Sequence, residues 1–259
     1  MMKISMNYFS TNLKNSTYKN CKGEKTMNNR YFDLDIDVTN PAPRCPVILL
    51  LDTSYSMSGK PIQELNRGLH QFICETAYDE AASMSVELEI ITFNSKVEIK
   101  MPFTPICNVD KNPPPLTVDG CTNLGEALDL AIKELGKRRK TYQNNGIPYF
   151  KPWVILMTDG RPTDNWQDPA RRIKKMAEDK NITYLGVEIG KQVDREIMFQ
   201  LMPNRNPMLA TLDKLEFKKF FRWLTSSMST LSNSAVSAQD DLQFDDISSW
   251  GTWHKLYNK

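Results

Sequence analysis

Two apolar runs in the chain each lead into an aspartate. Residues 47–52 have the sequence VILLLD, and residues 153–160 have the sequence WVILMTDG. Neither run alternates apolar with polar positions, which is typical of a central strand covered on both faces. The pattern therefore predicts two buried strands that lead directly into the carboxylates Asp52 and Asp159.

Other segments alternate, as strands with one polar face do. Residues 31–38 (YFDLDIDV) alternate strictly and predict a half-buried edge strand. Residues 86–95 and 96–103 predict a hairpin that turns at Asn94-Ser95, with its second strand, charged at alternate positions, at a sheet edge. Further strands are expected at 182–190 and 208–211.

Apolar residues recur at helical spacing between these strands. Pro61 suits the first turn of the first helix. The spacing predicts helices over 62–73, 124–135, 168–179, 194–202 and 217–224. Strands that alternate with helices predict an α/β fold: a doubly wound, mostly parallel central sheet with one antiparallel edge strand and helices on both faces.

This α/β domain is predicted to span residues 31–231. Residues 1–30, rich in Asn, Lys, Ser and Thr, are expected to form a flexible N-terminal tail, and Met27 is an alternative start. Residues 232–259 lose periodicity and predict a C-terminal tail. This tail is either a segment that docks on a partner or a final strand or helix packed on the domain, and docking is favoured.

Composition narrows the classes of function. The chain has 33 basic and 31 acidic residues, a net charge of +2, which argues against a protein that binds nucleic acid mainly through phosphates. The basic runs at 136–140 and 171–175 are therefore expected on solvated helix surfaces. The five cysteines form no CxxC pair, so a disulfide framework or thiolate zinc site is not expected. Cys121, with no histidine nearby in the sequence to activate it, is expected to be packed.

The sequence also indicates the cellular compartment of the protein. The first residues lack the apolar core of a signal peptide, and no stretch approaches the roughly 18 apolar residues of a membrane span. A cytoplasmic protein is expected.

Hydroxyl groups accompany the two strand-end carboxylates. Ser54 and Ser56 follow Asp52, and Thr122 lies in the loop DGCTNLG, just before a predicted helix. Because ligands bind beyond the carboxyl ends of parallel strands, these residues and Asp159 are expected to converge. All-oxygen ligation suits Mg²⁺, with Mn²⁺ or Ca²⁺ as alternatives, rather than Zn²⁺. An open coordination position would accept a carboxylate from a partner protein.

These residues resemble a known motif. DTSYS at 52–56 matches the DxSxS pattern of the von Willebrand factor A domain, with Thr122 and TDG at 158–160 in the expected order. Together they resemble its metal-ion-dependent adhesion site, and the resemblance covers about residues 44–231. It implies that Ser54, Ser56 and Thr122 coordinate the metal directly, and that Asp52 and Asp159 act directly or through water.

Within that family the motifs look most like bacterial TerY-type proteins. Those proteins are cytoplasmic and associated with tellurium-resistance and stress gene clusters, some together with a protein kinase and a PP2C-type phosphatase. Tyr55 departs from the small residue common in that group, but no ligand is lost. The resemblance implies an adaptor that captures an Asp or Glu of a partner in a stress-response, phospho-signalling or defence system.

Four residues near the motif are candidate partner contacts: Tyr55, Arg161, Asp164 and Trp166. Aromatic and Arg side chains favour interface hot spots, but a packed surface loop explains the segment 161–166 equally well. Two other functions stay open. One is a Mg²⁺-dependent phosphohydrolase that uses Asp52, although Ser54 stands where haloacid-dehalogenase-type enzymes carry a second Asp. The other is a structural domain with a non-functional site.

Overall fold

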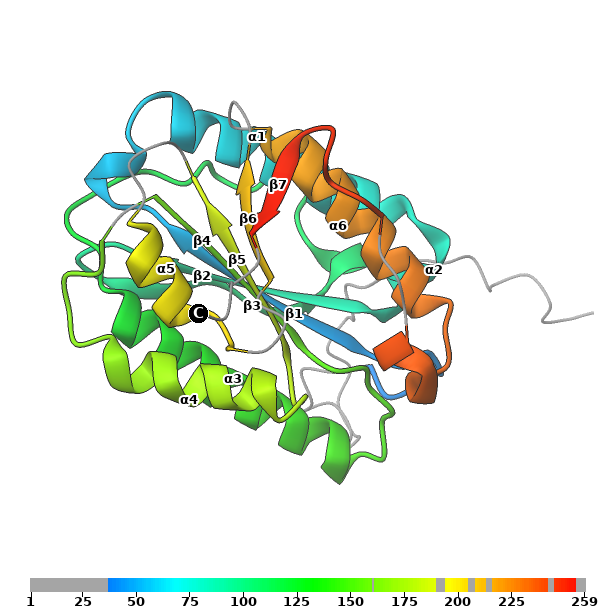
Figure 1. The fold of residues 1–259 in the computed structure, drawn as a ribbon. Coiled ribbons are helices and arrows are strands. Elements are labelled where there is room, and N and C mark those ends of the chain that lie inside the picture. Colours follow the sequence, from blue (N-terminus) through cyan, green and yellow to red (C-terminus); the bar gives the residue numbers. More distant parts are fainter. Residues whose placement is uncertain are drawn as a thin grey trace, which may run out of the picture. The chain divides into compact units, whose positions relative to one another are not determined.

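The chain folds around one mostly parallel sheet (Figure 1). A computed structural model describes residues 37–159, 161–189, 194–204, 208–212, 216–241 and 245–254. Its seven strands are ordered β3-β2-β1-β4-β5-β6-β7 across the sheet. The strands are β1 (Cys45–Asp52), β2 (Val86–Phe93), β3 (Val97–Pro105), β4 (Trp153–Thr158), β5 (Thr183–Glu188), β6 (Met208–Leu212) and β7 (Gly251–His254).

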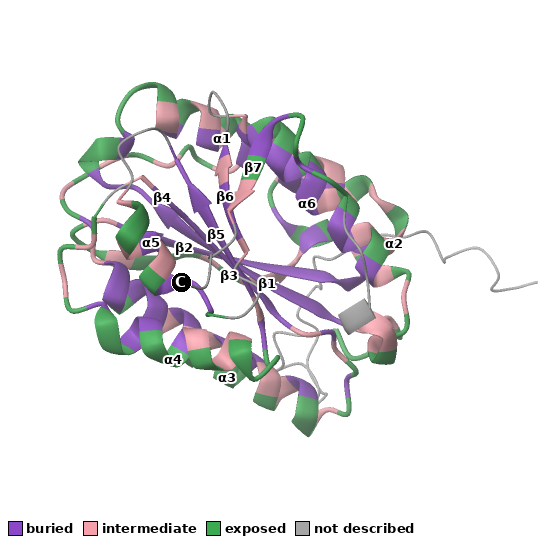
Figure 2. Ribbon diagram, in the orientation of Figure 1, coloured by how far each residue is buried: buried purple, intermediate pink, exposed green. Residues whose placement is uncertain are grey.

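Both faces of the central strands are buried, as the unbroken apolar runs predict (Figure 2). Every residue of β1 is buried. Its side chains alternate, so Val47 and Leu49 belong to one core cluster and Ile48 and Leu50 to the other. The sheet therefore separates two hydrophobic cores, and the central strands cannot carry a polar face.

Helices cover both faces of the sheet. α1 (Lys60–Tyr78), α2 (Glu80–Ser85) and α6 (Phe217–Ser232) lie on one face, and α3 (Leu124–Asn144), α4 (Gln167–Glu178) and α5 (Arg195–Leu201) on the other (Figure 1). Short 3₁₀ helices occupy Tyr55–Met57, Ile106–Asn108 and Val236–Asp241. Pro61 lies in the first turn of α1, as predicted. The doubly wound α/β fold is confirmed.

The antiparallel strands differ in part from the prediction. β3 pairs antiparallel with β2 at one edge, which confirms the hairpin around Asn94-Ser95. β7 pairs antiparallel with β6 at the opposite edge, where no strand was predicted as part of the sheet.

The C-terminal region is part of the domain where the structure describes it. Ile247 and Trp250 are buried, and Trp250 packs edge-on against Phe220 of α6 with ring centroids 6.3 Å apart. Residues 245–254 thus adopt the packed-strand alternative, and β7 continues the sheet beyond residue 231, where the predicted domain ends. The cause is contact with α6, which sequence periodicity does not report.

The N-terminal region is described only from Asp37. The predicted tail 1–30 and residues 31–36 of the predicted strand 31–38 lie outside the described residues. Val38, which was assigned to that strand's apolar face, lies in a turn and is 43% exposed. The strand prediction is therefore wrong at this residue.

One basic run contains a buried arginine. Arg138 Nη2 lies 2.5 Å from Glu87 Oε2, and both side chains are almost fully buried. Tyr142 donates a hydrogen bond to the same oxygen, and Arg44 lies 3.4 Å from Glu87 Oε1. Arg138 therefore joins α3 to β2 instead of facing solvent as predicted for 136–140.

Among the described helices, none is long and apolar enough to span a membrane.

Candidate metal centre

The candidate centre lies where β1 and β4 end. The two strands are parallel neighbours with Leu51 paired to Met157, so Asp52 and Asp159 leave the sheet at the same edge. Both strands are held in place by packing on both faces. The parallel pairing therefore brings together carboxylates that are more than a hundred residues apart in sequence.

Asp52 is fully buried and its two oxygens are both engaged. Oδ1 accepts the backbone N–H of Ser54 at 2.8 Å, and Oδ2 accepts the hydroxyl of Thr158 at 2.5 Å. Burial raises the pKa of Asp52 to about 6, although hydrogen bonds from Ser54 and Thr158 oppose that rise. The fold thus fixes this carboxylate in one orientation.

A row of hydroxyl groups joins the two strand ends. The Oγ atoms of Ser54 and Ser56 lie 2.9 Å apart, and Ser56 Oγ donates to Asp159 Oδ1 at 2.6 Å. Burial also raises the pKa of Asp159 above its usual value. Four of the five predicted ligands therefore form one connected set: Asp52, Ser54, Ser56 and Asp159.

The loop that carries Thr122 is tied to this set through its backbone. Tyr55 N–H donates to the carbonyl of Gly120 at 3.1 Å. Gly120 has φ +59°, and a Cβ there would lie 2.0 Å from Ser95 Oγ, so the close approach requires glycine. Thr122 is 5% exposed and follows two residues later, so the structure places the fifth predicted ligand in the adjacent loop.

A second contact fixes Thr122 from the other side. Its N–H donates to Thr163 Oγ1 at 3.0 Å, and Thr163 N–H donates to the Thr122 carbonyl at 2.9 Å. Thr158 and Thr163 were not predicted as site residues. A lone threonine at the end of an apolar strand, before Asp159, was the available signal for Thr158. Nothing in the sequence marks Thr163.

The four candidate partner contacts separate into two groups. Tyr55 is 69% exposed, and the exposed Arg161 forms an ion pair with Asp194 at 2.9 Å. Trp166 is buried in the core on the α3 side of the sheet, with 9% of its surface exposed. Asp164 accepts the N–H groups of two α3 residues, as described below. For Trp166 and Asp164 the structure supports the packed-loop alternative.

Asp164 caps the N-terminus of α3. Its Oδ1 accepts the N–H of Gly125 at 3.0 Å, and its Oδ2 accepts the N–H of Glu126 at 2.9 Å. These N–H groups have no partner inside the helix, and a carboxylate there also complements the helix dipole.

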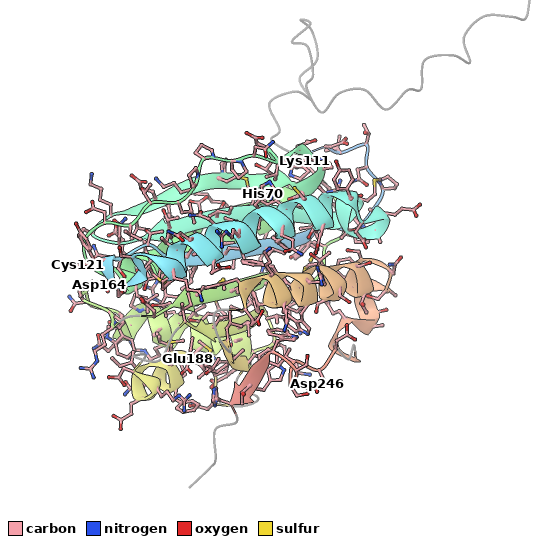
Figure 3. The ribbon with its side chains drawn as sticks, turned by 90° about the horizontal axis from the view of Figure 1, so that it is seen from above. His70, Lys111, Cys121, Asp164, Glu188 and Asp246 are labelled. Atoms are coloured by element: carbon pink, nitrogen blue, oxygen red, sulfur yellow. The ribbon has the colours of Figure 1, made fainter. Side chains whose placement is uncertain are left out.

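Figure 3 shows Asp164 and Cys121 at the same end of the domain. Cys121 is exposed, so the prediction of a packed thiol is wrong.

The donor set fits a hard divalent cation. Asp52 and Asp159 repel each other, and within the described part of the chain neither forms an ion pair with Lys or Arg. A cation would compensate the negative charges of the buried Asp52 and the half-buried Asp159. The other donors are hydroxyls, which suit Mg²⁺ better than Zn²⁺. Among the described residues no three His, Cys, Asp or Glu cluster.

Solved structures share this fold at low sequence identity. The pilus adhesin SpaC of Lactobacillus rhamnosus GG, in its open conformation, is 13% identical with a TM-score of 0.57, and the match covers 72% of this chain and 30% of that one. A mutant PilB minor pilin of Streptococcus sanguinis is 13% identical with a TM-score of 0.52, over 73% and 62% of the chains. Identities this low support likeness of fold alone.

A third similar structure is proximal thread matrix protein 1 from the mussel byssus. It is 17% identical with a TM-score of 0.51, and 72% of this chain matches 48%, about half, of that protein's length. A search of curated proteins found no match. The family model for the von Willebrand factor type A domain matches residues 47–221, which is more than half of the chain and includes every candidate ligand. The chain therefore belongs to the von Willebrand factor type A domain family.

Proposed function

We propose that this chain is a metal-dependent protein-binding module. Domains of this family often bind proteins in a metal-dependent manner. Ser54, Ser56 and Thr122 would hold Mg²⁺ directly, with Mn²⁺ or Ca²⁺ as alternatives, and Asp52 and Asp159 would hold it directly or through water. When bound, the ion supplies a positive charge with an open position for an Asp or Glu of the partner.

The observation that carries the proposal is the connected row from Asp52 to Asp159. Ser54 and Ser56 connect the buried carboxylate of Asp52, at the end of β1, to the half-buried carboxylate of Asp159, which directly follows β4. Thr158 and the Ser54 N–H orient Asp52, so its side chain is positioned before a ligand arrives. Preorganised ligands of this kind lower the entropic cost of binding.

The rim of the centre would contact the partner. Tyr55 lies between the two serine ligands in sequence and is 69% exposed. Arg161 is 74% exposed and follows Asp159 by two residues. Tyr and Arg are enriched among residues that dominate binding energy, and these two are therefore the proposed partner contacts.

The residues of the centre favour a binding role over catalysis. An aspartyl-phosphate phosphohydrolase of the haloacid-dehalogenase type needs a second carboxylate two residues after its nucleophilic Asp. Ser54 supplies a hydroxyl where the phosphohydrolase alternative needs a second carboxylate. We therefore propose that the chain is not an enzyme.

The setting is proposed from the resemblance to TerY-type proteins. On that basis the chain acts in the bacterial cytoplasm as an adaptor in a stress-response, tellurium-resistance, phospho-signalling or defence system. Its partner would be a protein kinase, a PP2C-type phosphatase or a defence complex, without direct contact to nucleic acid.

Affinity capture with Mg²⁺ and with EDTA tests this function. Partners identified by mass spectrometry should be recovered only with Mg²⁺ and should be lost in Ser56→Ala, Asp159→Ala and Asp52→Ala. Ser56 is exposed, so its replacement should leave the fold intact. Asp168→Ala, at an exposed carboxylate of α4, is the matched control. Equal capture of the same partners in EDTA would exclude the mechanism. Phosphatase turnover that Asp52→Asn abolishes would favour the enzyme.

A further inference from the structure

A cavity lies apart from the metal centre. It has a volume of about 960 Å³ and lies between α1, β3 and the proline-rich segment 108–117. None of the candidate metal ligands line it. Its floor is apolar and consists of Leu69 and Ile73 of α1, Ile90 of β2 and Met101 of β3. This volume is at the upper end of the ~300–1,000 Å³ typical of small-molecule sites.

The outer wall of the cavity is fixed in place. Asn66 of α1 donates its Nδ2 to the Leu116 carbonyl at 2.9 Å and accepts the Leu116 N–H on Oδ1 at 2.8 Å. Three consecutive prolines, 113–115, precede Leu116 and restrict the backbone. His70 of α1, visible in Figure 3, contacts Asn112 of the same wall at 3.4 Å. The cavity is therefore formed before any ligand binds.

The rim of the cavity is positively charged. Arg67, Lys100 and Lys218 line it, and Asp110 is the single carboxylate among the described lining residues. Lys218 is exposed and forms no ion pair within the described part of the chain. An anion at the rim would therefore gain favourable charge interactions that a neutral or cationic ligand would not.

Two of these side chains, Arg67 and Lys100, form exposed ion pairs that a bound anion could replace. Arg67 pairs with Glu64, and Lys100 pairs with Glu98, but neither glutamate lines the cavity. Both pairs are solvent-exposed, with Arg67 61% and Lys100 49% exposed. Exposed pairs of this kind contribute little and are readily exchanged for another anion.

We propose that this cavity binds a free small-molecule amphipathic anion. The ligand would be a carboxylate or sulfonate joined to an apolar body of about 10–20 non-hydrogen atoms, a size suited to such a volume. The apolar floor takes the body, and Arg67, Lys100 and Lys218 take the anionic group. The site works without the metal centre, so EDTA leaves it unchanged.

Titration of the full chain with 8-anilinonaphthalene-1-sulfonate tests the proposal. N-phenyl-1-naphthylamine is the uncharged counterpart, and decanoate competes for the site. One molecule should bind per chain, and decanoate should displace it. The double variant Lys100→Glu/Lys218→Glu should weaken binding of the sulfonate roughly tenfold, because each exposed ion pair contributes up to about fivefold in affinity. Binding of the uncharged probe should not change.

Two further variants sharpen the test. Lys133→Glu/Lys140→Glu changes the net charge equally at exposed positions on α3 and should bind the sulfonate like the original protein. Leu116→Trp fills the cavity and should abolish binding. Absent saturable binding, equal losses in both lysine variants, or an uncharged probe that binds as tightly as the sulfonate would overturn the proposal. Self-association that Leu116→Trp disrupts would assign the cavity to a second copy of the chain and also overturn it.

Discussion

Replacing Asp164 with alanine separates a structural role from a partner contact. Its carboxylate accepts the N–H groups of Gly125 and Glu126 in the first turn of α3, at 3.0 Å and 2.9 Å. Without it these two donors depend on water, and α3 loses a negative charge at the positive end of its dipole. Loss of a capping side chain costs about 0.5–2 kcal/mol, and two bonds to a carboxylate favour the upper half of that range. We expect Asp164→Ala to lower the free energy of unfolding by about 1–2 kcal/mol.

The same substitution should act on the metal centre at a distance. Asp164 follows Thr163, which exchanges hydrogen bonds with the backbone of Thr122. Release of the cap loosens the segment that positions Thr122. Loss of residues that orient metal ligands typically costs about 10–100-fold in affinity. Because this link is indirect, we expect a loss near tenfold in Mg²⁺ affinity.

Urea unfolding in EDTA and calorimetric titration with Mg²⁺ measure the two effects separately. Asp168→Ala is the control, since Asp168 is 76% exposed and pairs with an exposed arginine. Its replacement should change stability by less than about 0.5 kcal/mol. Asp164→Asn keeps an acceptor oxygen and should recover part of both losses. If Asp164→Ala leaves stability and metal affinity unchanged but abolishes partner capture, Asp164 is a partner contact and the capping argument fails.

Three other predictions follow from single contacts. Gly125→Ala should destabilise the protein by about 1–3 kcal/mol, because the added Cβ would lie 2.4 Å from the carbonyl oxygen of Asn165. Gly136→Ala in the same helix adds a Cβ that meets nothing within 4 Å, so it should stabilise the protein by up to about 1 kcal/mol. Urea unfolding of the two variants measures both changes. Burial raises the pKa of Glu89 to about 7, so its contribution to stability is complete below pH about 4.5 and is lost as the pH rises through 7. Glu89→Gln should therefore flatten unfolding free energy against pH across that window, and an unchanged slope would contradict it. Trp250→Ala should cost about 3–5 kcal/mol in unfolding free energy if residues 245–254 belong to the domain, and almost nothing if they only dock on a partner.

The central strands could be predicted because their burial is local in the sequence. A run such as 47–52 has no polar position to place toward water, so only a strand covered on both faces accommodates it. Asp52 and Asp159 then had to lie at the carboxyl edge of a parallel sheet. Alternation of strands with helices makes the strands parallel, so their carboxyl ends meet at one edge of the sheet, whereas the pairing of β1 with β4 is a tertiary contact that the alternation does not specify.

Trp166 shows where that reasoning stops. The segment GRPTDNW has no periodicity that would place its tryptophan inside or outside. The indole is buried because the backbone at 165–166 lies against Gly125, where no side chain intervenes. A glycine at the start of a helix has many explanations, and only the tertiary contact identifies this one. Trp250 and β7 escaped prediction in the same way, since their contacts are with α6 and β6.

The metal centre combines both kinds of determinant. Its carboxylates lie at the ends of strands that the sequence specifies locally, and the buried Asp52 and half-buried Asp159 carry negative charges that repel each other. Its hydroxyls come from loops held by long-range contacts, such as Gly120 to Tyr55 and Thr163 to Thr122. A cation would stabilise the folded state because it neutralises the first group and is oriented by the second. Substitutions in the loops should therefore weaken metal binding without unfolding the domain. Loss of Asp52 should lower both metal affinity and stability, because it removes the buried acceptor of the Ser54 N–H and the Thr158 hydroxyl.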